Sequence, residues 1–105
     1  MRILFVHQNF PGQYVHIVQR LARAGNHQLV ALGINEPDAN RPLPESLNYF
    51  RYPLERGNTQ GIHPFVTETE TKIIRAEGCA RAAEQLKGKG FTPDLICAHP
   101  GCLLY

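Results

Sequence analysis

Apolar residues in this chain gather in short runs of the kind that strands buried on both faces require. Aliphatic side chains dominate residues 2–6 (RILFV), 28–34 (QLVALGI) and 94–98 (DLICA), with little alternation between apolar and polar positions. A shorter aromatic run occupies residues 49–52 (YFRY). The pattern predicts a strand in each of these four segments.

The apolar spacing between the first two runs is typical of an amphipathic helix. A helix is predicted from residue 13 to residue 24, followed by Gly25 as a capping signal. The side chains expected on its buried face recur at intervals of three and four residues. They are Tyr14, Ile17, Val18 and Leu21.

A longer helix is predicted over residues 64–87, with Gly88 and Gly90 at its end. Thr67 and Glu70 have the spacing of a capping box near its start. Its expected core face is rich in alanine, which would let the helix lie close to a sheet. That face comprises Val66, Ile73, Ala76, Ala80, Ala83 and Leu86.

Strands that alternate with helical crossovers predict a doubly wound α/β fold, with a mostly parallel sheet covered by helices. In the strand order 3-2-1-4, the first and fourth strands are neighbours and the winding reverses between them. Ligands bind at such a reversal, outside the carboxyl ends of the strands. The loops at residues 8–13 and 99–102 are therefore predicted to line a cleft. The loop at residues 35–48 holds three prolines and is long for a compact domain, which favours a functional role.

Length, charge and cysteine content narrow the class of protein. The 105 residues, 1–105, fit one domain. The formal net charge is +2 and the basic residues are spread along the chain, which predicts no nucleic-acid partner and no anionic-lipid surface. Three cysteines without CxxC spacing do not indicate a disulfide framework, and no run is long enough for a transmembrane segment. We expect a cytoplasmic protein.

The loop after the first strand is a candidate binding element. Backbone N–H groups at the start of a helix attract anions such as phosphate, and Gly12 permits a close approach or a positive φ angle. Two interpretations stay open: a phosphate or substrate contact made by Asn9, Gly12 and Gln13, or a plain strand-to-helix turn. The absence of GxGxxG and GxxxxGK[ST] motifs argues against a dinucleotide or P-loop site.

His99 is the candidate catalytic residue. An imidazole at the carboxyl end of a strand can hydrogen-bond a substrate hydroxyl or take its proton near neutral pH, although it could instead satisfy local backbone groups. The topology directs His99 to the expected cleft. His7, at the end of the adjacent strand, and Gly101 are candidate binding residues beside it.

Other reactive side chains carry weaker signals. No spacing motif gathers His7, His99 and Cys102 into a metal site, so none is expected. Cys97 lies inside an apolar run, where cysteine behaves as a small hydrophobe rather than a nucleophile. His16 is expected to be a partly exposed helix residue.

Two stretches together resemble a known family. MRILFVHQNFPGQY with the helix after it, and PDLICAHPG near the end, are similar to the N-terminal domain of family 4 glycosyltransferases. The resemblance follows the same order through the whole chain. It implies one Rossmann-like half of the GT-B architecture, in which two domains face each other across a cleft.

The resemblance also implies a function. The family transfers sugars with retention of configuration, receives a sugar or glycan acceptor mainly on the N-terminal domain, and holds the nucleotide-sugar donor on the C-terminal domain. It implies that Asn9 to Gln13 lie near donor phosphates and acceptor, and that His99 lies by the reacting sugar. No metal and no cofactor are implied, since the nucleotide sugar is a substrate.

The tail after HPG departs from the family pattern, so we expect a truncated acceptor-side domain that is inactive alone. The alternatives are a dimerising interaction module and a small phosphate- or nucleotide-binding protein. An uncovered edge at residues 94–98 predicts a homodimer, with residues 103–105 beside the contact.

Overall fold

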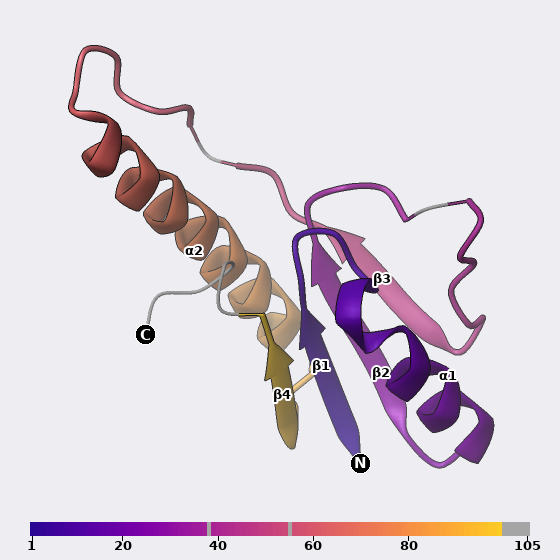
Figure 1. Cartoon of the computed structure of the whole chain (residues 1–105). Helices are drawn as coiled ribbons and strands as arrows, with labels where there is room; N and C mark the ends of the chain where they lie inside the picture. Colours follow the sequence, from indigo (N-terminus) through magenta and orange to yellow (C-terminus); the bar gives the residue numbers. More distant parts are fainter. Residues whose placement is uncertain (38, 55, 100–105) are drawn as a thin grey trace.

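The apolar runs form a single parallel sheet in the order β3-β2-β1-β4 (Figure 1). The computed structural model describes residues 1–37, 39–54 and 56–99. Its elements in chain order are β1 (Arg2–Val6), η1 (Gly12–Tyr14), α1 (Val15–Ala24), β2 (Gln28–Gly33), β3 (Leu47–Arg51), α2 (Pro64–Gly88) and β4 (Leu95–Ala98). The predicted fold class and strand order are confirmed.

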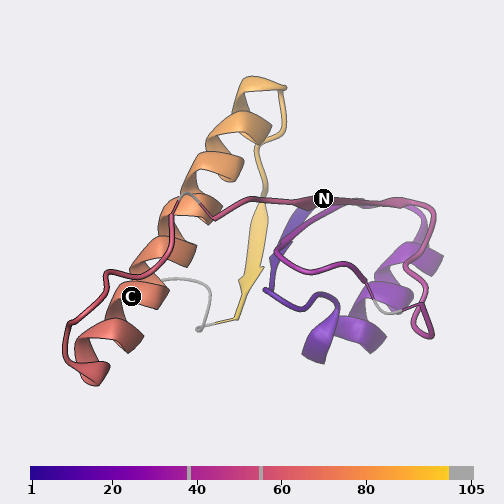
Figure 2. The ribbon, with the colours of Figure 1, turned by 90° about the horizontal axis from the view of Figure 1, so that it is seen from above.

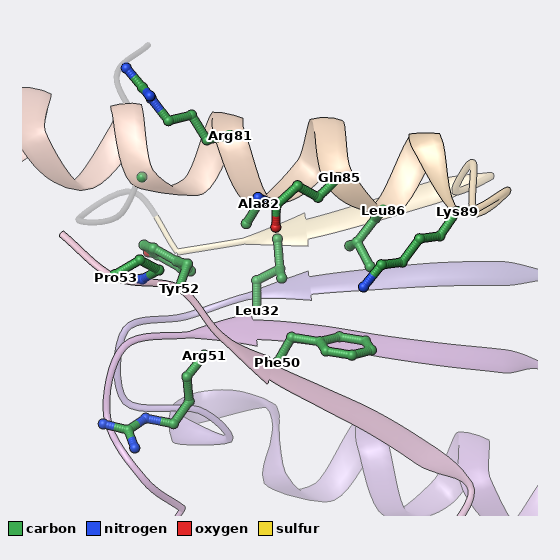
Figure 3. Close-up of a pocket in the computed structure, with 11 residues that line it drawn as sticks. Leu32, Phe50, Arg51, Tyr52, Pro53, Arg81, Ala82, Gln85, Leu86 and Lys89 are labelled. Carbon is green, nitrogen blue, oxygen red and sulfur yellow. The ribbon is translucent and has the colours of Figure 1, made fainter. Parts of the chain in front are cut away.

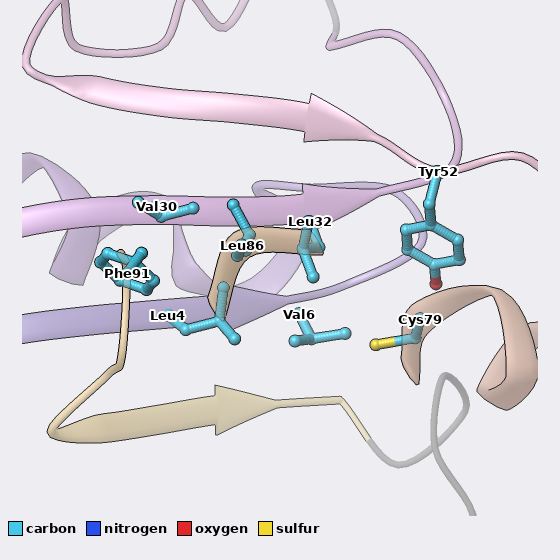
Figure 4. Packing of buried hydrophobic residues seen from close by; sticks show 8 residues of the cluster. All are labelled: Leu4, Val6, Val30, Leu32, Tyr52, Cys79, Leu86 and Phe91. Carbon is cyan, nitrogen blue, oxygen red and sulfur yellow. The ribbon is translucent and has the colours of Figure 1, made fainter. Parts of the chain in front are cut away.

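Helices cover both faces of the sheet, as the uninterrupted apolar runs require. Successive side chains of a strand point to opposite faces, so Phe5 of β1 packs on the α1 side while Leu4 and Val6 pack on the α2 side. Figure 2 shows α1 and α2 on opposite sides of the strands. Figure 4 shows the cluster on the α2 side, where Leu86 and Cys79 of the helix meet the strands.

The buried face of α1 differs from the prediction. Ile17 is 49% exposed, while Val18 is buried and Leu21 and Ala22 pack against the same cluster. The helix begins with a 3₁₀ turn, Gly12–Tyr14, which has about three residues per turn instead of 3.6. The buried side of α1 centres on Val18, Leu21 and Ala22, which leaves Ile17 at its edge. Gly25 ends the helix with φ of 74°, which confirms the predicted cap.

The start of α2 also differs from the prediction, because Thr67 and Glu70 do not form a capping box. His63 is the N-cap, and its Nδ1 accepts a hydrogen bond from the Phe65 N–H at 3.1 Å. The carboxylate of Glu70 instead accepts hydrogen bonds from the backbone N–H and the hydroxyl of Thr59. The Glu70 carboxylate, which a capping box would have used as acceptor, is therefore bound to the loop before the helix.

The buried stripe of α2 is rotated relative to the predicted face. Val66, Ile73 and Ala80 are exposed, and of the predicted set Leu86 alone is fully buried. The first turns of the helix project past the sheet, so their apolar residues have no strand beneath them (Figure 1). The buried side of the helix is formed by Ile74, Gly78, Cys79 and Leu86.

The third strand begins two residues earlier than predicted. Leu47, which the proline-rich sequence had assigned to a loop, is buried in the sheet and pairs with Leu29. Tyr52 lies just after the strand and is still only 3% exposed. Burial of Leu47 thus extends the strand toward the prolines.

Gly78 sets how closely α2 approaches the end of β3, and its replacement by alanine is expected to destabilise the fold. An added Cβ would lie 2.9 Å from the Pro53 carbonyl oxygen and 3.0 Å from a Tyr52 ring carbon. Such overpacking costs about 1–3 kcal/mol. Gly88 of the same helix has nothing within 4 Å of an added Cβ, so Gly88→Ala is a matched control.

Urea denaturation of the two variants measures the difference. Gly88→Ala should be neutral or stabilising by up to about 1 kcal/mol, because alanine loses less backbone entropy than glycine on helix formation. Equal stability of the two variants would show that α2 can move away from Tyr52 at no cost.

Candidate functional site

Two histidines meet at the carboxyl ends of adjacent strands. The backbone N–H of His7 donates to the Leu32 carbonyl at 3.1 Å, and that of His99 donates to the Val6 carbonyl at 2.9 Å. Each bond continues the sheet by one residue, so both rings emerge at the same edge. The ring centroids of His7 and His99 are 4.6 Å apart. The structure therefore brings together the two histidines that the topology argument had placed at the cleft.

His7 is held on several sides. Its side chain is mostly buried, and its Nδ1 accepts a hydrogen bond from the Asn9 backbone N–H at 3.0 Å. The Tyr14 ring lies edge-on at 6.1 Å between centroids. Burial, and to a lesser extent the neighbouring His99, lowers the pKa of His7 below its ordinary value. The lowered pKa favours the uncharged imidazole at neutral pH.

Gly12 packs directly against this imidazole. Its φ angle is 49°, which non-glycine residues rarely adopt, and an added Cβ would lie 2.4 Å from Nε2 of His7. The glycine is thus required by the fit of a side chain, a reason that neither sequence interpretation had considered. Gln13 is exposed in the 3₁₀ turn that follows. Gly101 lies outside the described residues.

Asn9 ties the loop after β1 to the end of β2. Its side-chain oxygen accepts a hydrogen bond from the Asn35 amide. The Gln8 carbonyl accepts from the backbone N–H groups of Ile34 and Asn35, both at 3.1 Å. The Tyr49 hydroxyl of β3 donates to the Asn35 carbonyl. Hydrogen bonds from the end of β2 therefore fix the loop, and the Tyr49 hydroxyl of β3 in turn holds Asn35.

A hollow lies beside this loop and includes residues that sequence reasoning missed. Glu36 and Arg41, from the loop after β2, face the loop after β1 across it. Glu36 forms an ion pair with Arg51 at 3.2 Å, and Arg41 is exposed. The length of the proline-rich loop was the one signal that could have found them. The hollow is lined by Asn9, Phe10, Pro11, Gly12, Glu36 and Arg41.

A second hollow lies between α2 and β3 and carries less chemistry. Figure 3 shows the guanidinium groups of Arg51 and Arg81 pointing away from it, while Lys89 reaches toward Phe50. The Lys89 Nζ lies 5.9 Å from the centroid of the Phe50 ring. The polar groups around this second hollow do not converge on one point, whereas His7 and His99 meet at the carboxyl edge of the sheet.

Comparison with known proteins assigns the family. The model of the Glycosyl transferase family 4 group matches residues 25–102, which is more than half of the 105 residues. The chain belongs to the glycosyl transferase family 4 group. The resemblance seen in the sequence is thereby confirmed. Searches of curated proteins and of solved structures gave no match.

The matched region divides the candidate site of this glycosyltransferase-family chain. Residues 25–102 include Asn35, Glu36, Arg41 and His99, whereas His7 and the loop to Gln13 precede them. The two sides of the site are joined by the contacts between His7 and His99 and between Asn9 and Asn35.

Among the described residues, no helix combines the length and apolar character needed to cross a membrane.

Proposed function

We propose that this domain forms the acceptor side of a retaining glycosyltransferase that uses a nucleotide sugar as donor. The observation that supports the proposal most strongly is the pairing of His7 and His99 at the carboxyl edge of a family 4 glycosyltransferase sheet. A sugar or glycan acceptor would lie across this edge, and the donor would be held by a second domain opposite it.

His99 is the proposed catalytic residue. Sugar transfer forms a bond from an acceptor oxygen to the anomeric carbon, breaks the bond from that carbon to the donor phosphate, and releases the acceptor's proton. An imidazole at this position would accept a hydrogen bond from the attacking hydroxyl and could take its proton. As the family resemblance implies, no metal and no further cofactor are part of the proposal, and the nucleotide sugar is a substrate.

The loop after β1 is the proposed binding element. Asn9, Gly12 and Gln13 would contact polar groups of the acceptor and the donor phosphates. Arg41 supplies a positive charge beside the same hollow, while the Glu36 carboxylate is paired with Arg51. His7 and Gly101 complete the proposed set. The loop is already fixed by hydrogen bonds, so little ordering would accompany binding.

We expect the 105-residue chain alone to show no sugar transfer from any nucleotide sugar. Orienting donor and acceptor together lowers a barrier by about 7–11 kcal/mol, and one domain supplies one wall of the cleft. Radiolabelled transfer to a panel of glycosides would test this expectation. Calorimetry should find weak binding of glycosides and no tight binding of nucleotide sugars.

His99→Ala should abolish glycoside binding, whereas His16→Ala, an exposed histidine of α1, should leave it unchanged. Turnover by the purified chain that is lost in His99→Ala would contradict the one-wall proposal. Tight binding of a nucleotide sugar without glycoside binding would favour a phosphate- or nucleotide-binding protein.

A second candidate function is a dimerising interaction module. Strand β4 is at one edge of the described sheet, and its Leu95 and Ile96 are 46% and 55% exposed. An apolar edge of this kind can pair with a second copy through a two-fold interface. Sedimentation at micromolar concentration would test for the dimer, and a monomer that shows a cooperative melting transition would exclude this second function.

The cytoplasmic location stays a prediction.

A further inference from the structure

The hydrogen bond from Asn9 assigns the tautomer of His7. A neutral imidazole has one donor and one acceptor nitrogen, and Nδ1 here accepts the Asn9 N–H at 3.0 Å. The ring proton therefore resides on Nε2. A second proton on Nδ1 would face the Asn9 N–H and abolish the bond.

The ring of His7 has little room to reorient. The side of the ring toward η1 meets Gly12, where even a Cβ would lie 2.4 Å from Nε2. The His99 ring lies against it at 4.6 Å between centroids, tilted by 49°. The residue is 9% exposed. The position of the His99 ring therefore depends on that of His7.

The Asn9 bond is also the first of a series that crosses the sheet edge. The backbone of Asn9 is bound to His7, and its side chain is bound to Asn35 at the end of β2. Asn35 in turn accepts from the Tyr49 hydroxyl of β3. One acceptor atom on His7 thus helps to hold the loop that lines the hollow.

We propose that His7 is a positioning residue: its neutral imidazole holds residues 8–13 in their binding conformation and orients the His99 ring, and protonation of Nδ1 releases the loop. The part of this inference that concerns binding rests on the proposed function. The part that concerns the loop does not.

The direction of the pH effect follows from the surroundings of His7. The titratable groups whose rings face it are His99, after β4, and Tyr14, in η1. Burial first, and then His99, holds the pKa of His7 below 6.5. The folded state favours the neutral form of His7. The contribution of His7 to the free energy of unfolding is therefore complete above pH 6.5 and decreases as the pH falls through the lowered pKa. The loop should open over the same range.

Two substitutions at His7 separate the roles of its acceptor and its ring. His7→Asn places an amide oxygen near the position of Nδ1, so it keeps the acceptor without a titrating group. His7→Phe keeps a ring against His99 but removes the acceptor. The Asn9 amide should exchange with solvent roughly tenfold faster in His7→Phe than in wild type, and remain protected in His7→Asn.

Nitrogen-detected NMR of the ¹⁵N-labelled chain tests the inference without a ligand. We expect the Nε2–H tautomer for His7, and an Asn9 amide shift that follows the His7 titration in wild type and is independent of pH in His7→Asn. In His99→Gln the pKa of His7 should rise but stay below 6.5, since burial is the larger cause. If His7→Phe does not fold, wild type and His7→Asn still provide the test.

An Nδ1–H tautomer, or an Asn9 amide whose shift ignores the His7 titration, would overturn the inference. Binding of methyl glycosides tests the proposed function separately. If wild type shows the predicted tautomer and titration but binds no glycoside, the loop inference stands and the proposed function fails. Glycoside binding that weakens more in His7→Phe than in His7→Asn would support both.

Discussion

Replacement of Gly12 with alanine should destabilise the domain by about 2–5 kcal/mol. Two costs combine in this variant: a left-handed backbone at φ of 49°, and a Cβ placed 2.4 Å from Nε2 of His7. The imidazole cannot move aside easily, because His99 lies against it and Asn9 is bound to its Nδ1. Thermal and urea unfolding, together with the Asn9 amide exchange rate, would measure the effect.

Gly25→Ala is the matched control for this variant. Gly25 has φ of 74°, but an added Cβ would have nothing within 4 Å. Its cost should be that of the left-handed backbone alone, about 1–2 kcal/mol, with no change in Asn9 exchange. If the two variants lose the same stability, the packing of Gly12 on His7 is not a structural requirement.

Phe5→Ala is expected to have the largest effect of any single truncation, about 3–5 kcal/mol. Phe5 is fully buried in the central strand β1, and its ring contacts Phe10 and Tyr14 at centroid distances of 5.9 and 5.4 Å. These two partners anchor the loop that carries Asn9 and Gly12. The cavity should therefore increase amide exchange in the loop as well as lower the unfolding midpoint.

The control for Phe5 is Phe50→Ala on strand β3. Phe50 is 40% exposed, so its truncation removes less buried surface and leaves the loop in place. We expect a loss below about 1.5 kcal/mol and unchanged exchange at Asn9. A comparable loss in both variants would mean that burial at β1 does not dominate the stability of the sheet.

The sheet could be predicted from the sequence because its signals are local. Runs such as residues 2–6 specify strands buried on both faces, and long helical crossovers require parallel pairing. The strand order then placed His7 and His99 at one edge. Family membership and fold class followed from the same segments and are confirmed.

The helix faces could not be predicted in the same way. Ile17 fits an apolar stripe, yet α1 packs Val18, Leu21 and Ala22 on the sheet and leaves Ile17 exposed. Ile73 fits a second stripe, yet α2 turns Ile74 and Gly78 toward the strands instead. Periodicity identifies a helix, but the sheet beneath it selects the side that is buried.

The close fits at the site were also beyond sequence reasoning. Gly12 is five residues from His7, and no local rule requires a glycine against an imidazole. Arg41 reaches the hollow through a loop whose path depends on the bonds between Asn9, Asn35 and Tyr49. Such contacts arise from three-dimensional packing of segments that carry no shared pattern.

Amide-shift mapping of the ¹⁵N-labelled chain with a panel of methyl glycosides tests the central claim most directly. An acceptor bound at the carboxyl edge should shift the amides of residues 8–10, Gly12, Gln13, Asn35, Glu36 and His99. The His99→Ala substitution should abolish those shifts. Shifts confined to the groove of Phe50, Gln85 and Lys89 between α2 and β3 would contradict the claim.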